Sequence, residues 1–251
     1  MPDALLTQFN AGSELNCIAE QRHAADSAAL VKYSRDEPVI EQHGSRMNTL
    51  ESAGYASRLR RLIAADPQCM RILRQLAALE PQACLAAGVI RNSVWAHLHG
   101  QRYALEQAEI DVIFYDAQDD GPRAAQLQQR LKHAFPGIAW DVVNQALVHR
   151  WYRLENGASI QPLRSISHAV SLWPETATAV AVRLDAQGNL QILAPLGLAD
   201  LFQLRLRWNP ALVSCTVFLD RARSKGFLAK WPKLKLAPAF FYRRRQKSPP
   251  F

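Results

Sequence analysis

Two carboxylates stand at the start of a strongly apolar stretch, where a buried strand would ordinarily hold none. They are Glu109 and Asp111, in the run EIDVIFYD at residues 109–116. The β-branched and aromatic residues over 110–115 predict a buried strand, and residues i and i+2 of a strand project from the same face. A buried carboxylate is costly unless something pairs with it. A divalent cation is one such partner, and Mg²⁺ typically takes one or two carboxylates and leaves its other positions for water and phosphate oxygens.

A third carboxylate, Asp141, lies in the next apolar stretch, IAWDVV at residues 138–143. If this second predicted strand neighbours the first, Asp141 can face the same metal ions, as a two-metal arrangement requires. Each piece also has a simpler interpretation. An ExD pair is common by chance, and Asp141 alone could cap a turn.

A glycine precedes these strands and opens a predicted helix. In the segment AGVIRN, Gly88 would let a phosphate approach the backbone, and the helix start offers N–H groups that have no partner within the helix. Arg91 could add a fork of donors to a phosphate, and Asn92 lies at the start of the helix predicted over 92–98. Gly88 could equally be a plain helix boundary. The order of glycine turn, helix, carboxylate pair, helix and carboxylate strand is what favours a phosphate-handling site.

The spacing of apolar residues predicts the helices and strands that position these side chains. Apolar residues at helical spacing predict two helices between residues 47 and 79, with Asp66-Pro67 starting the second. A short strand or helix end is expected over 83–88 and an amphipathic helix over 123–134. The order helix–helix–strand–helix–strand–helix–strand fits an α+β or α/β sandwich.

The C-terminal half carries weaker signals. Residues 178–184 and 190–194 look like paired segments around the turn DAQGN, and 196–204 like a short helix. Pro174-Glu175 has the composition of a helix start. Residues 216–230 predict one basic amphipathic helix that Pro232 ends.

Composition separates three regions. Of 251 residues, 49% are hydrophobic and the formal charge is +8, with a mean hydropathy of −0.16. Residues 1–46 are polar and acidic and predict a disordered arm or a wrongly chosen start; 47–235 would be the folded domain and 236–251 a basic tail. Residues 221–251 hold many Lys and Arg and no Asp or Glu. Such a basic stretch could bind phosphates, nucleic acid or an anionic surface, or it could simply be a solvated end.

Several classes of protein find no support. The chain shows no GxGxxG, no GxxxxGK[ST] loop and no nucleophile elbow. Its four cysteines form no CxxC pair, so no zinc ribbon is expected. No stretch approaches the ~18 apolar residues of a membrane helix, and no secretory signal is visible at residues 1–16. A cytoplasmic location without membrane contact is expected.

The segment AGVIRNSVWAHLHG…EIDV is similar to the GGxVRDxLLG…DxDx signature of the tRNA CCA-adding enzymes, within the nucleotidyltransferase superfamily that includes DNA polymerase β. From about residue 50 onward the chain resembles an uncharacterised bacterial nucleotidyltransferase-like family. That resemblance rests on GVIRNSVW, EIDVIFYD, WDVVNQALVHRWY, WPETATAVAVRL, APLGLADLF and KWPKL. Ala87 replaces the first glycine of the signature, Asn92 its Asp, and Glu109 its first carboxylate.

The resemblance implies an α+β fold, a mixed sheet flanked by helices with a helical N-terminal part and a C-terminal α/β extension. It implies transfer of a nucleotidyl group from an NTP to a hydroxyl of RNA, protein or a small molecule. Glu109, Asp111 and Asp141 would be the catalytic carboxylates and hold Mg²⁺ or Mn²⁺, while Gly88, Arg91 and Asn92 would bind the nucleotide. The alternative is an inactive module of the same fold that binds RNA or another polyanion, with contacts through the basic C-terminus.

Overall fold

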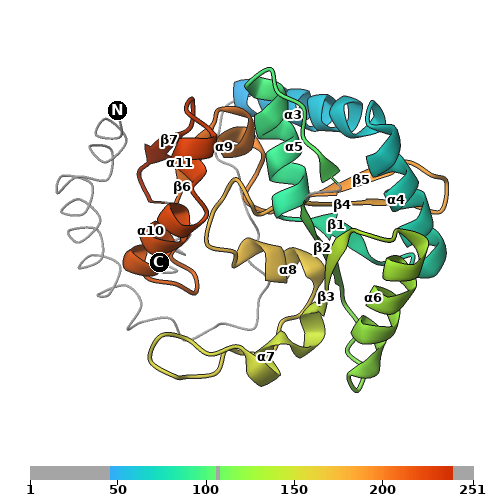
Figure 1. Cartoon of the computed structure of the whole chain (residues 1–251). Helices are drawn as coiled ribbons and strands as arrows, with labels where there is room; N and C mark the ends of the chain where they lie inside the picture. The colour runs from blue at the N-terminus through green and yellow to red at the C-terminus, as the bar shows by residue number, and fades with distance from the viewer. Residues whose placement is uncertain (1–45, 106–107, 240–251) are drawn as a thin grey trace, which may run out of the picture.

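The computed structural model describes residues 46–105 and 108–239, and within these ranges the chain forms a mixed sheet with helices on both faces (Figure 1). The predicted arm lies outside the described residues except for Arg46, as do residues 240–251 of the predicted tail. No helix in the described part of the chain is both long and apolar enough to cross a bilayer.

The strands form a five-stranded sheet in the order β3-β2-β1-β4-β5 and a separate parallel pair, β6 and β7. In the sheet, β2 and β3 are parallel, and the other neighbouring pairs are antiparallel. The strand bounds are β1 Cys84–Ala86, β2 Glu109–Phe114, β3 Ala139–Asn144, β4 Ala181–Leu184, β5 Leu190–Leu193, β6 Arg205–Arg207 and β7 Lys235–Ala237.

The helices connect these strands and cover the sheet. Their bounds are α3 Arg46–Ala64, α4 Pro67–Leu79, α5 Gly88–Leu98, α6 Pro122–Ala134, the 3₁₀ turn η3 Gln145–Leu147, α7 Val148–Trp151, α8 Ile166–Ser171, α9 Ala199–Phe202, α10 Cys215–Ser224 and α11 Phe227–Lys230. The predicted α+β class, the mixed sheet and the two strands that carry the carboxylates are confirmed.

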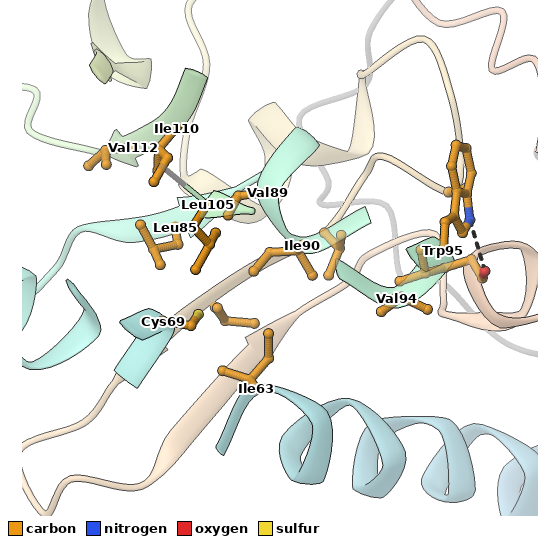
Figure 2. Packing of buried hydrophobic residues seen from close by; sticks show 14 of the residues in the cluster. Ile63, Cys69, Leu85, Val89, Ile90, Val94, Trp95, Leu105, Ile110 and Val112 are labelled. Atoms are coloured by element: carbon orange, nitrogen blue, oxygen red, sulfur yellow. Dashed lines mark hydrogen bonds between the residues drawn. The ribbon is translucent and has the colours of Figure 1, made fainter. Parts of the chain in front are cut away.

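Alternation along β2 separates two faces of the sheet. Ile110 and Val112 join Leu85 of β1 in the main core, against Val89 and Ile90 of α5 (Figure 2). The intervening positions, Glu109, Asp111 and Ile113, face the other way; Ile113 packs with Ile166 and Val170 of α8. The apolar face anchors β2, and the opposite face carries the carboxylates.

The helices α4 and α5 begin in different ways. Asp66 caps α4, and its carboxylate accepts hydrogen bonds from the backbone N–H groups of Gln68 and Cys69, both at 3.0 Å. Pro67 occupies the first turn, where its missing N–H costs nothing. At α5 no side chain caps the helix: Ala87 precedes it with φ 53° and ψ −117°. The turn before α5 therefore depends on backbone conformation rather than on a polar cap.

Two C-terminal expectations are wrong. The single helix predicted over 216–230 is two helices, because Gly226 takes the left-handed conformation with φ 60° and redirects the chain so that Phe227 and Leu228 are buried. The helix start expected at Pro174-Glu175 does not form. The backbone there pairs with β6 and the residues after it, with Glu175 bridged to Trp208, and Asn209 donates side-chain hydrogen bonds to two carbonyls of the same segment.

Candidate active site

The three predicted carboxylates lie on one face of the sheet. Glu109 and Asp111 are two residues apart on β2, and Asp141 is the direct partner of Asp111 on the parallel strand β3. Paired residues of neighbouring strands point to the same side of a sheet. Their charges are close enough to interact, because Asp141 and Glu109 both raise the pKa of Asp111. The sheet thus brings the three acids together as a cluster of negative charge.

Asp111 is the most enclosed of the three. Its side-chain oxygen Oδ2 accepts a hydrogen bond from the backbone N–H of Gly88 at 3.2 Å. Burial raises the pKa of Asp111, and Asp141 and Glu109 raise it further, whereas the Gly88 N–H and Arg91 act in the opposite direction. Two anions beside a half-buried carboxylate leave an excess of negative charge that a cation would relieve.

Asp141 and Glu109 are exposed. The pKa of Asp141 is also raised, by burial first and then by the charge of Glu109. The cluster therefore has one enclosed carboxylate at the glycine turn and two that face solvent, so a ligand can reach it from outside.

The turn that meets Asp111 runs from β1 into α5. Ala87 donates its backbone N–H to the carbonyl of Val180 at 3.0 Å, which ties the turn to the sheet. A Cβ added to Gly88 would lie 3.4 Å from Asp111 Oδ2 and 3.7 Å from Arg91 Nη2. The carboxylate and the guanidinium thus pack directly against the glycine backbone.

Arg91 is buried, at 6% exposure, so most of its guanidinium serves contacts within the protein. Nη1 donates to Thr178 Oγ1 at 2.9 Å, and Nε and Nη2 each donate to Asn92 Oδ1 at 3.1 Å. The group also lies 4.5 Å from the ring centre of Phe227. Burial lowers the pKa of Arg91 to about 10 against the opposing influence of Glu175. Arg91 is positioned beside Gly88 by its neighbours, and only part of it could meet a ligand.

Asn92 links Arg91 to a loop. Its Oδ1 accepts from Arg91, and its Nδ2 donates to the hydroxyl of Tyr103 at 3.3 Å. An acidic residue at position 92 would place a negative charge beside Arg91. The amide of Asn92 accepts the same hydrogen bonds from Arg91 without adding that charge. All six predicted site residues therefore lie along one continuous arrangement from β3 through β2 to the start of α5.

An ion pair between a buried carboxylate and a partly exposed arginine lies beside this arrangement and was not anticipated from the sequence. Glu175 is fully buried, and its Oε1 accepts from Arg221 Nε of α10 at 2.6 Å. Its Oε2 is buried without a hydrogen-bond partner among the described residues. The sequence signal for this ion pair is the single acidic residue in the apolar run WPETATAVAV. A charged residue in such a run is rarely buried unless it is paired, so a basic partner could have been sought.

The donor set suits a hard divalent cation, since all three side chains offer carboxylate oxygens on one face. Within the described residues, however, no three His, Cys, Asp or Glu side chains come close enough to enclose a metal ion by themselves. An ion here would take one or two carboxylates and complete its coordination with water or ligand oxygens, as Mg²⁺ commonly does.

Comparison with known proteins identifies a family and a fold. A nucleotidyltransferase family matches residues 74–236, which is more than half of the chain. The fold is similar to a protein whose NMR structure reveals a CCA-adding enzyme head domain, with 26% identity over 73% of this chain and 96% of that one, and a TM-score of 0.62.

Weaker likenesses involve larger enzymes. A CCA-adding enzyme in complex with CTP matches at 15% identity and a TM-score of 0.46, over 71% of this chain and 43% of that one. The Thermotoga maritima CCA-adding enzyme complexed with tRNA matches at 17% and 0.42, over 71% and 42%. The chain spans less than half of either enzyme. No curated protein matches the sequence. On the extent of the family match, the chain belongs to this nucleotidyltransferase family.

Proposed function

We propose that the chain is a Mg²⁺- or Mn²⁺-dependent enzyme that transfers a nucleotidyl group from an NTP to a hydroxyl acceptor. The observation that carries the proposal is the pairing of Asp111 with Asp141 across parallel strands, with the Gly88 N–H against Asp111. Adjacent anions would repel phosphates, so a module that only bound polyanions would gain nothing from them. Together with a cation, the same anions become a binding site for a triphosphate.

The residues divide the work. Asp111 with Asp141 would hold the ion next to the attacking hydroxyl, and Glu109 with Asp111 the ion at the triphosphate, and each ion would complete its coordination with water or ligand oxygens. Such ions would lower the pKa of the attacking hydroxyl and neutralise negative charge on the leaving pyrophosphate. Gly88 donates its backbone N–H to Asp111 and would leave the backbone uncovered for a phosphate to approach. Arg91 and Asn92 fix the start of α5, and Arg91 offers positive charge beside the glycine. Positioning and electrostatics would provide most of the rate.

The acceptor is best sought directly. Purified protein is incubated with each radiolabelled NTP, Mg²⁺ or Mn²⁺, and total cellular RNA and protein, and the products are separated on gels. Label should enter one class of acceptor with wild type and fall by at least ~100-fold with Asp111→Ala. Asp220→Ala, which changes an exposed acid on α10, is the matched control and should behave as wild type. Retained labelling by Asp111→Ala would defeat the assignment.

A further inference from the structure

A second surface, on the parallel pair β6 and β7, carries a groove that the carboxylate site does not use. The groove encloses about 660 Å³, which is within the range of ligand sites. It is lined by Gln203, Leu204, Arg205, Arg207, Lys233, Lys235, Leu236, Ala237 and Pro238. Among these described residues there are four cations and no Asp or Glu.

The register of the two strands gathers these cations. Arg205 pairs with Lys235, and Arg207 follows Arg205 by two residues on the same face. Leu206 and Leu236 form the intervening pair, and Leu206 is fully buried. Leu206 therefore packs inward, while Arg205, Arg207 and Lys235 line the groove together with the partly buried Leu236.

Of the four cations that line the groove, Arg207 forms an ion pair with a carboxylate, while Arg205 and Lys235 face each other. Arg207 is paired with Asp200, with Nε 2.8 Å from Oδ2 and Nη2 3.1 Å from Oδ1. Lys233 donates from Nζ to the backbone carbonyl of Leu98 at 3.0 Å, a neutral partner that does not offset the lysine charge. Arg205 and Lys235 are exposed and stand directly opposite each other. Like charges opposite one another destabilise a strand pair, so the folded chain alone gains nothing from this arrangement.

We propose that the β6–β7 groove binds one strand of nucleic acid through its phosphodiester backbone, with Arg205, Lys233 and Lys235 as the main contacts. Arg and Lys along a strand match successive phosphates. None of the described residues that line the groove is aromatic, so the contacts they offer are to the phosphodiester backbone rather than to the bases. The large hydrophobic side chains that are exposed in the described part of the chain, Trp151 and Val217, do not line the groove, so neither could enter a bilayer there.

The groove does not depend on the proposed catalysis. The carboxylates lie on β2 and β3 of the five-stranded sheet, whereas β6 and β7 form a separate pair to one side of that sheet (Figure 1). A chain without transferase activity could bind nucleic acid here, and an active one could lack such binding. A variant of the groove keeps Glu109, Asp111 and Asp141, so failure of one proposal is distinguishable from failure of the other.

The test compares full-length wild type with Arg205→Gln/Lys235→Gln for binding of a fluorescent single-stranded RNA of mixed sequence, by anisotropy over a range of salt. We expect affinity to fall on the order of tenfold at about 0.1 M salt, and the slope of log K against log salt to decrease by about 1.4, for two phosphates lost. The thermal midpoint should be unchanged or higher, since a like-charged pair is removed.

The control is Arg130→Gln/Lys132→Gln, which removes the same charge from exposed positions on α6 and should leave binding unchanged. An equal loss of affinity in both double variants would overturn the proposal, because net charge rather than the groove would be responsible. Displacement of the RNA by poly-glutamate at equal charge concentration would overturn it too, in favour of an acidic polypeptide. Tighter binding of duplex RNA than of the single strand would contradict the single-strand assignment.

Discussion

At Ala87 the backbone adopts φ 53° and ψ −117°, a region that glycine tolerates far better than any residue with a Cβ. Ala87 stands where the related signature has its first glycine. The turn therefore has a backbone conformation that suits glycine, although the residue there is alanine. The conformation persists because the surroundings impose it, including the hydrogen bond from Ala87 to Val180. Such strain costs on the order of 1–3 kcal/mol.

Replacing Ala87 by glycine should therefore stabilise the protein. We expect the free energy of unfolding to rise by about 1 kcal/mol, the relieved strain less the extra entropy that glycine gives the unfolded chain. Urea denaturation of Ala87→Gly measures it. Ala86→Gly is the control: Ala86 lies in buried β1 without positive φ, so that change should destabilise. Destabilisation by Ala87→Gly would show that the turn is not strained.

The raised pKa of Asp111 predicts how the stability of the protein depends on pH. Its pKa is raised in the folded protein, first by burial and then by Asp141 and Glu109, so the folded state holds the proton more tightly than the unfolded state. Its contribution to stability is therefore fully present below the unfolded pKa and is lost as pH rises through the folded pKa.

Asp111→Asn keeps an acceptor for the Gly88 N–H and removes the charge. We expect its thermal midpoint to exceed that of wild type by about 2–4 °C at pH 7 and the difference to shrink toward pH 3. Calorimetry across this pH range checks it, with Asp220→Asn as an exposed-acid control. A difference that is constant with pH would refute the linkage.

Among the elements, the strands that carry the site were predictable and the C-terminal helices were not. Strand parity and β-branched content predicted that Glu109, Asp111 and Asp141 lie on two strands; that these strands are neighbours was a condition of the prediction, which the parallel pairing of β2 and β3 meets. Residues 216–230 share one helical pattern, and only the left-handed φ at Gly226 divides them. Glu175 was misread because its strand-like pairing with Trp208 is set by residues far along the chain.

The break between α10 and α11 has a direct test. A Cβ on Gly226 would meet nothing within 4 Å, so Gly226→Ala adds backbone strain alone and should cost about 1 kcal/mol. Gly54 of α3 also has open space but no positive φ. Gly54→Ala should stabilise by about 0.5–1 kcal/mol, since alanine favours a helix interior. Equal effects of the two substitutions in denaturant unfolding would contradict this account of the break.

For the molecule as a whole, the C-terminal part completes the core behind the site. Trp231, at 2% exposure, packs edge-on against Trp95 of α5, and Phe227 does the same while lying over Arg91. Local patterning cannot reveal such contacts, because they join segments more than a hundred residues apart. The start of α5, and with it Gly88 and Arg91, is supported from the far end of the chain.

Trp231→Ala should consequently cost about 3–5 kcal/mol, as expected for removing a buried aromatic residue. Trp151, at 61% exposure on α7, offers the matched control, and Trp151→Ala should change stability by no more than about 0.5 kcal/mol. Urea unfolding gives both values. Comparable losses would mean that α11 is not part of the same core.

The central claim is that carboxylates from β2 and β3 jointly bind a divalent cation with a nucleotide. Electron paramagnetic resonance of Mn²⁺, titrated with protein and ATP, measures that binding directly. The account predicts Mn²⁺ bound in the presence of ATP, with affinity reduced at least ~10-fold in both Asp111→Asn and Asp141→Asn and unchanged in Asp220→Asn. Mn²⁺ binding that is the same in wild type and in both β-strand variants would contradict it.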